Sequence, residues 1–340
     1  MSATKSWIAA KSWIAWMLVL GCSGAKPEPA PVPEWQAVFE DLPGALLRVF
    51  GQDGVVYAIG ADGDGRGPLV LRFDGASWRR LATGATGDLW WGTVLGADRV
   101  RMVGEAGLVV DYVPSADRFE ILPKPTDSTL FGVWGASEND VWYVGGLPAL
   151  SSGVILRGDS VSTRPFEPQP TETSSATMFK AHGFSSSDVF VVGQRGTALR
   201  FDGQRFAPTE VEPKLPLISV HGTAPDALYA VGGGASGLIV RYDGEKWADE
   251  TPTETPQLSG VWAVDRETAF AAGFNGRIYR RSAGVWSEEA GPIPTYEDLH
   301  GVYVDPEGAI WAVGGRLATD PPTKGVLVRY GAPISSETEN

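Results

Sequence analysis

Short apolar runs separated by polar turns recur along most of the chain. In the clearest stretch, Leu130-Phe131-Gly132-Val133-Trp134-Gly135 precedes a polar turn, and Asp140-Val141-Trp142-Tyr143-Val144-Gly145 follows it. A third run comes after a glycine-containing loop, as in Ala198-Leu199-Arg200-Phe201, and several units then add an Asp-Gly turn and an aromatic residue. Runs of this length, rich in β-branched and aromatic residues and bounded by Gly and Asp, predict β-strands.

A glycine at the end of each second strand marks the period of the repeat. Successive glycines are 39 to 48 residues apart, and most of these steps are close to 42; they are Gly60, Gly104, Gly145, Gly193, Gly232, Gly273 and Gly314. One four-stranded propeller blade takes about 40–45 residues. The spacing therefore predicts an all-β fold, a seven-bladed β-propeller over residues 34–331.

The two ends of this region complement each other. The last unit ends at Tyr330 after only three strands, which would leave two sheet edges unpaired. Glu34-Trp35-Gln36-Ala37-Val38 resembles a fourth-strand segment, with Trp35 in the place that Trp247 takes in its own unit. We therefore predict that an N-terminal strand completes the seventh blade, and that residues 332–340 form a polar tail.

The first 33 residues have a different character. Residues 1–21 combine Lys5 and Lys11 with a short apolar run and a small residue, which is typical of an export signal and too short to cross a bilayer. Val19-Leu20-Gly21-Cys22 resembles the lipobox of bacterial lipoproteins, which implies cleavage before Cys22 and a lipid on its thiol. The alternative is an ordinary signal peptide with an incidental cysteine. Residues 22–33 carry alternating prolines, which favour an extended tether.

Composition narrows the classes of partner. The net charge is −13, and no run of basic residues is present, so nucleic acid is not expected as a partner. Cys22 is the only cysteine, which excludes an intramolecular disulfide and a cysteine-based metal site. We expect a monomer that needs no cofactor.

The repeat also carries a family resemblance. Its units resemble those of bacterial lipoprotein propellers with G-V-W-G, D-V-W-x-V-G and R-Y-D-G-x-x-W motifs, and are more distantly similar to kelch and BNR-type propellers. Asp74-Gly75-Ala76-Ser77-Trp78 lacks the leading serine of the BNR motif, which argues against sialidase-like activity. The resemblance covers residues 34–331 and implies the fold, not a function.

Aromatic and histidine residues align at one place in the predicted innermost strands. They are Phe50, Val94, Trp134, His182, His221, Trp262 and Tyr303. We favour packing between blades as their role; the alternative is a ring that grips a ligand at the channel mouth, chiefly through Trp134, His182, His221, Trp262 and Tyr303. His182 and His221 are too few for a metal site, which needs three or four ligands, and His300 is offset from them, so no metal is expected.

Other polar residues recur without converging on one point. Third-strand arginines recur in six units, and we expect them to pair with turn carboxylates between blades; they are Arg72, Arg157, Arg200, Arg241, Arg280 and Arg329. Asp140, Asp188 and Asp226 lie in or beside a turn, where Asp caps backbone N–H groups. Asp62-Gly63-Asp64-Gly65 lacks the later ligands of a calcium loop, so we interpret it as a plain loop. No catalytic residue is proposed.

These patterns favour a non-enzymatic binding or scaffold protein at the bacterial cell envelope. It would be anchored to the cell membrane or the outer membrane through Cys22, face the periplasm or the surface, and bind an unidentified envelope protein, peptide or glycan. One alternative is a glycan-acting hydrolase or lyase with its site at the channel mouth, which would need two converging carboxylates. Another is a structural lipoprotein of envelope assembly.

Overall fold

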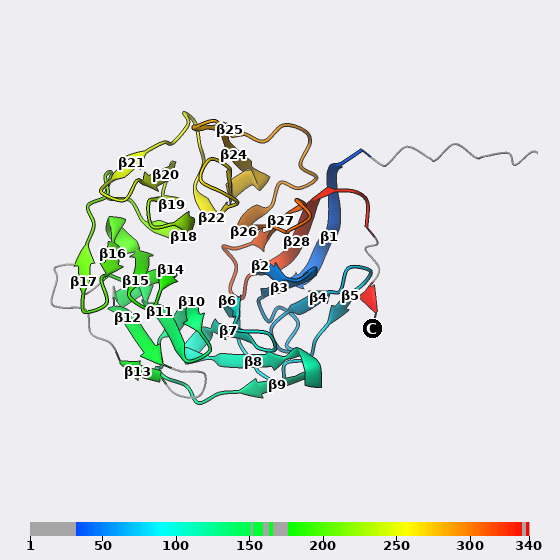
Figure 1. Cartoon of the computed structure of the whole chain (residues 1–340). Coiled ribbons are helices and arrows are strands. Elements are labelled where there is room, and N and C mark those ends of the chain that lie inside the picture. The colour runs from blue at the N-terminus through cyan, green and yellow to red at the C-terminus, as the bar shows by residue number, and fades with distance from the viewer. Residues whose placement is uncertain (1–31, 151, 159–162, 166–175, 335–337, 340) are drawn as a thin grey trace, which may run out of the picture. The chain divides into compact units, whose positions relative to one another are not determined.

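Seven antiparallel sheets form a ring in the computed structural model, which describes residues 32–150, 152–158, 163–165, 176–334 and 338–339. Six sheets have four strands and one has five, and the chain passes from blade to blade in sequence order around the ring (Figure 1). The predicted seven-bladed β-propeller is confirmed. Residues 1–31, with the expected export signal and Cys22, lie outside the described residues.

Each blade is built outward from the channel. The innermost strands are β2 (Leu46–Gln52), β6 (Leu89–Val94), β10 (Thr129–Ser137), β14 (Met178–Ser185), β18 (Leu217–Ala224), β22 (Leu258–Ala263) and β26 (Asp298–Val304). The second strands are β3 (Val55–Gly60), β7 (Val100–Gly104), β11 (Asp140–Leu147), β15 (Asp188–Gly193), β19 (Ala227–Gly233), β23 (Ala269–Gly273) and β27 (Ile310–Arg316).

The outer pair of strands is shorter than the inner pair in every blade except the last. The third strands are β4 (Val70–Phe73), β8 (Val109–Val113), β12 (Ser152–Gly158), β16 (Ala198–Phe201), β20 (Gly237–Tyr242), β24 (Ile278–Ser282) and β28 (Thr323–Gly331). The fourth strands are β5 (Trp78–Arg80), β9 (Arg118–Ile121), β13 (Thr163–Pro165), β17 (Phe206–Pro208), β21 (Trp247–Asp249), β25 (Val285–Glu288) and β1 (Glu34–Gly44).

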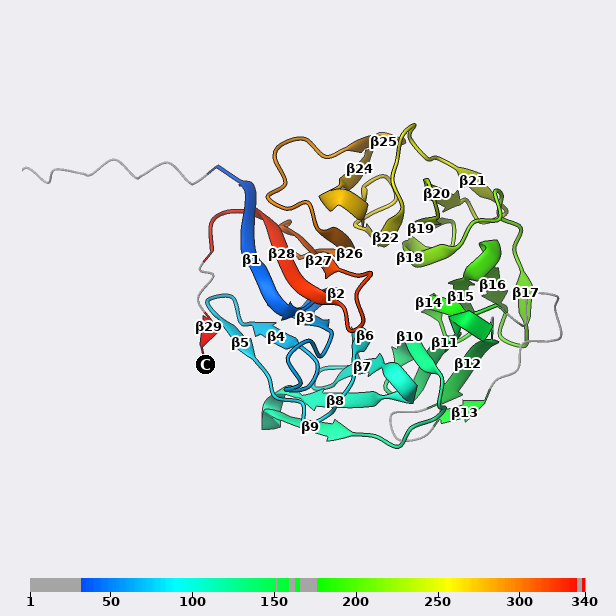
Figure 2. The ribbon, with the colours of Figure 1, turned by 180° about the vertical axis from the view of Figure 1, so that it is seen from behind.

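The N-terminal strand closes the ring, as predicted. β1 pairs antiparallel with β28 (Figure 2). In this pairing Trp35 lies opposite Tyr330. Val38 of β1 joins a buried cluster that also contains Trp78 and Trp311, so the closing strand contributes to the core between the last blade and the first. The C-terminal tail adds one more pairing, because β29 (Thr338–Glu339) runs parallel to β5 of the first blade.

The seven marker glycines have a common steric cause. A Cβ added at Gly145 would lie 2.0 Å from the carbonyl oxygen of Thr129 on the neighbouring strand, and the equivalent distances at the other six glycines are 1.9–2.3 Å. No L side chain fits so close to a backbone oxygen, so the repeat requires glycine there. The period of the sequence therefore follows from one tight contact in each blade.

Candidate ligand pocket in the propeller channel

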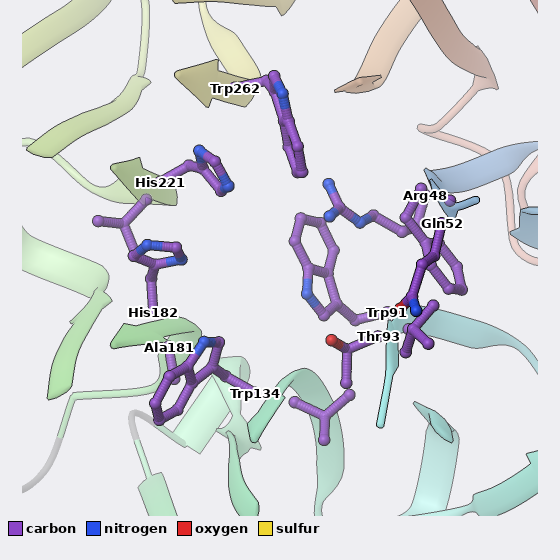
Figure 3. Close-up of a pocket in the computed structure, with 15 residues that line it drawn as sticks. Arg48, Gln52, Trp91, Thr93, Trp134, Ala181, His182, His221 and Trp262 are labelled. Atoms are coloured by element: carbon purple, nitrogen blue, oxygen red, sulfur yellow. The ribbon is translucent and has the colours of Figure 1, made fainter. Parts of the chain in front are cut away.

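The predicted ring lies where the innermost strands surround the channel. Trp134, His182, His221 and Trp262 line a cavity (Figure 3). Its volume is about 260 Å³, and Phe50 and Val94 also line it. Tyr303 is buried beside this cavity and packs against Trp262, with ring centroids 4.9 Å apart. The sequence alignment was wrong in the second blade, because the strand register places Thr93, not Val94, at the position equivalent to Trp134.

Four consecutive blades supply a continuous arc of rings. His182 and His221 have centroids 4.6 Å apart, and His221 stacks on Trp262 at 3.9 Å with an angle of 21° between the planes. Trp134 continues the arc by lying over Gly183 of the next blade, where an added Cβ would come within 2.6 Å of the indole. These residues therefore pack against neighbouring blades and line the cavity at the same time, so the two roles considered for them are compatible.

Hydrogen bonds orient both histidines of the arc. The Nε2–H of His182 donates to the carbonyl oxygen of Gly222 at 2.8 Å, since a carbonyl can only accept. The backbone N–H of Ala263 donates to Nδ1 of His221 at 3.0 Å, which leaves the proton of the neutral ring on Nε2. Burial lowers the pKa of His182 to about 4 and that of His221 well below its usual value, so both rings are neutral at pH 7.

Two cations and a tryptophan lie beside the arc. The guanidinium carbon of Arg48 lies 3.9 Å from the ring centroid of Trp91, and the ammonium nitrogen of Lys180 lies 4.1 Å from the same centroid. Lys180 also donates to the carbonyl oxygen of Phe131 at 2.6 Å. Cation–π contact stabilises a positive charge over an indole face, more strongly where water is excluded. Figure 3 shows Arg48 and Trp91 across the cavity from His182 and His221.

Arg48, Trp91 and Lys180 were not predicted as site residues. By strand register they occupy the position that is Gly132, Ser219, Gly260 and Gly301 in the other four blades. A large side chain at a position that the repeat keeps small is a signal visible in the sequence. It becomes interpretable only once the register is known, because all three departures point to the same part of the channel.

A third histidine lies at a neighbouring level. His300 is buried, its Nδ1–H donates to the carbonyl oxygen of Leu47 at 2.6 Å, and burial lowers its pKa to about 3. It aligns with Phe131, as expected, and its ring is 6.0 Å from that of Trp90. Across the described ranges, no group of three or more His, Cys, Asp or Glu side chains is arranged to hold a metal ion.

The third-strand arginines lie away from the cavity and do not converge. Arg157 binds Asp140 and Arg200 binds Asp188, each through two hydrogen bonds within a single blade. The expectation of pairing between blades was therefore wrong for these two carboxylates, because the aspartate begins the strand next to its arginine. Arg157 does reach the next blade through the carbonyl oxygen of Ser186.

Hydrogen bonds to Asp62 and Asp64 hold the loop Asp62-Gly63-Asp64-Gly65 in place. The carboxylate of Asp64 accepts two hydrogen bonds from Arg80, and this partner holds the pKa of Asp64 at about 2. Asp62 accepts the backbone N–H of Gly67. Both carboxylates are thus engaged in shaping the loop, which agrees with its interpretation as a plain loop.

Comparisons with known proteins report on the fold. No protein-family model matches the sequence, and no curated protein matches it. Streptogramin B lyase has a similar solved structure, with a TM-score of 0.71 and 12% identity over 88% of this chain and 98% of the lyase. YCF48 from Cyanidioschyzon merolae has a TM-score of 0.65 and 14% identity over 87% of this chain and 98% of that one. YCF48 bound to D1 peptide has a TM-score of 0.66 and 14% identity over 91% and 100% of the two chains.

At these identities the similarities establish the β-propeller fold alone. The neighbours differ in what they do, so the fold does not select an activity. A search of the described residues for a helix long and apolar enough to span a membrane finds none.

Proposed function

We propose that this chain is a lipid-anchored, extracytoplasmic binding protein of a bacterial cell envelope, and that its ligand enters the channel at the ring. The observation that carries the proposal is the cavity of about 260 Å³ lined by Trp134, His182, His221 and Trp262. A concave site with aromatic walls and a few oriented polar groups is typical of small-ligand recognition. Strands from six blades supply the walls, so little ordering is required on binding.

The anchoring part of the proposal rests on the sequence. Val19-Leu20-Gly21-Cys22 resembles a lipobox, and the prolines between Cys22 and Glu34 favour an extended spacer. A lipid on Cys22 would hold the propeller a short distance from the membrane, with room for an envelope protein, peptide or glycan to reach it.

Binding is favoured over hydrolysis by the chemistry of the lining. Glycoside hydrolysis commonly uses two carboxylates flanking the scissile bond. Within the part of the chain that the structure describes, the residues lining this cavity include no Asp or Glu. A propeller structure, that of YCF48, is known with a peptide bound, which supports peptides as one class of ligand to test.

The test is a ligand screen with a matched pair of variants. Full-length protein in detergent would be screened against short peptides, oligosaccharides and small metabolites, and hits would be measured by calorimetry. Trp262→Ala should reduce the affinity for any ligand of this cavity at least tenfold. Tyr296→Ala alters a side chain that is 93% exposed and should leave that affinity unchanged. A ligand whose affinity ignores Trp262→Ala, or one that is turned over, would contradict the proposal.

A further inference from the structure

Arg48 is a buried cation with no anion beside it. Its side chain lies in the channel, and the residue is only 7% exposed. Within the described residues it forms no ion pair, and its Nε has no hydrogen-bond partner. By contrast, the buried Arg101 of the next blade is paired with Asp111. Burying a charge without a partner is costly, so an unpaired guanidinium at this depth calls for an explanation in terms of function.

Packing does not account for an arginine at this position. The equivalent residue is Gly132, Ser219, Gly260 or Gly301 in four other blades. At Gly260 an added Cβ would lie 2.9 Å from the backbone of Gly301, so that blade requires a small residue, whereas Trp91 and Lys180 are the large residues at this position in the two remaining blades. Four blades therefore form with Gly or Ser at this position, so the blade itself does not require a side chain as long as that of Arg48.

The surroundings of Arg48 leave its charge uncompensated. The lining of the cavity contains no carboxylate among the described residues, and the nearby histidines are neutral. Lys180 donates a hydrogen bond to the carbonyl oxygen of Phe131, and burial lowers the pKa of its amine well below the usual value. Burial lowers the pKa of Arg48 to about 9, so the guanidinium is still charged at pH 7.

The groups around Arg48 suit one small anion. A guanidinium presents two parallel N–H donors that match a carboxylate. The Nε2–H of His221 has no hydrogen-bond partner in the described part of the chain and faces the same cavity, so it offers one more donor. Trp91 and Trp262 supply flat apolar walls, and the arginine carbon lies 3.9 Å and 5.7 Å from their ring centroids.

We infer that the channel binds a monoanionic carboxylate, held by Arg48, with the planar or apolar remainder of the ligand against Trp262. Arg48 is the one charged side chain among the described residues that line the cavity, and its guanidinium matches the single charge of a carboxylate better than the double charge of a phosphate monoester. The carboxylate can belong to a small molecule or to the C-terminus of a peptide. This inference rests on the proposed function, since it names the ligand class of the same cavity.

The decisive comparison uses two ligands of the same shape. Full-length protein in detergent is titrated with benzoate, benzamide and inorganic phosphate, following heat and tryptophan fluorescence. We expect benzoate to bind at least tenfold more tightly than benzamide or phosphate. Tripeptides that end in phenylalanine, with a free or an amidated C-terminus, distinguish a peptide C-terminus from a small-molecule carboxylate. If only the free tripeptide binds more tightly than benzoate, the ligand is a chain end. If both tripeptides bind more weakly than benzoate, the ligand is a small carboxylate.

Two arginine variants provide the matched control. Arg48→Met should reduce benzoate affinity at least tenfold, while its melting temperature should stay the same or rise, because an unpaired buried charge has been removed. Arg72→Met is the control, since Arg72 also has an unpartnered Nε but lies outside this cavity, and benzoate affinity should not change. A merely structural Arg48 would instead lower the melting temperature and leave the benzoate-to-benzamide ratio of the folded protein near one.

Equal affinities for benzoate and benzamide in the unmodified protein would overturn the inference, whatever the variants do. So would failure of benzoate to bind at millimolar concentrations, or unchanged affinity in Arg48→Met. A neutral ligand that depends on Trp262 but not on Arg48 would refute the carboxylate while leaving the proposed function standing.

Discussion

Closure of the ring by the N-terminal strand can be tested with a single buried side chain. Val38 of β1 is 6% exposed, in the cluster with Trp78 and Trp311 that lies between the last blade and the first. Val38→Asp places a carboxylate in this cluster. Val32 precedes the strand and is 81% exposed, so Val32→Asp makes the same chemical change nearby without burial.

The size of the effect follows from burial. Losing a fully buried valine costs about 2 kcal/mol, and an unpaired carboxylate at the same place costs about 2–3 kcal/mol more even after partial protonation. The sum, about 4–5 kcal/mol, is a large part of the 5–15 kcal/mol that typically separates folded from unfolded domains. In a domain of this size each kcal/mol corresponds to about 2 °C, so we expect Val38→Asp to melt about 8–10 °C lower.

Differential scanning calorimetry of the two variants beside the unmodified protein provides the measurement. Val32→Asp should melt within about 1 °C of the unmodified protein, because surface substitutions rarely exceed 0.5 kcal/mol. Equal melting temperatures for Val38→Asp and Val32→Asp would refute the closure of the ring by this strand.

Three further predictions concern charge and anchoring. Burial raises the pKa of Asp88 to about 6, so the folded protein holds this proton more tightly than the unfolded chain does. From pH 7 to pH 5 the free energy of unfolding should therefore rise by about 1 kcal/mol more in the unmodified protein than in Asp88→Asn. Urea unfolding at both pH values measures this, and the same change in both proteins would contradict it. Asp111→Ala leaves buried Arg101 without its carboxylate and should cost about 3–5 kcal/mol in urea unfolding, and adding Arg101→Met should recover part of the loss; purely additive effects would argue against coupling. Cys22→Ala should move the protein from the membrane to the soluble fraction on cell fractionation, and unchanged membrane attachment would rule out the lipid anchor.

The fold could be predicted from the sequence because the repeat has a local steric cause. Each second-strand glycine is forced by a neighbouring carbonyl oxygen, so the period survives even where other residues diverge. The open last unit and the fourth-strand likeness of the segment at Trp35 then predicted closure, which β1 confirms. The pairing of Arg157 with Asp140 inside one blade was not predicted, because strand order within a blade, not motif order along the chain, decides which side chains meet.

The residues of the candidate site could be predicted only in part from the sequence. The ring of Trp134, His182, His221 and Trp262 was found by alignment, since these residues occupy equivalent positions in the repeat. Arg48 escaped notice because its significance depends on what surrounds it: an unpaired charge is a property of the folded channel. Thr93 was also missed, because the alignment of the second blade was offset by one residue and placed Val94 at the position of Trp134.

A crystal of the full-length protein soaked with 4-bromobenzoate would show directly whether the channel binds a carboxylate at Arg48. The anomalous signal of bromine locates the ligand without ambiguity. We expect one dominant bromine peak in the channel near Trp262, with the carboxylate within hydrogen-bond distance of Arg48. Bromobenzoate bound at full occupancy elsewhere on the propeller, or bound in the channel with its carboxylate turned away from Arg48, would contradict carboxylate binding by Arg48.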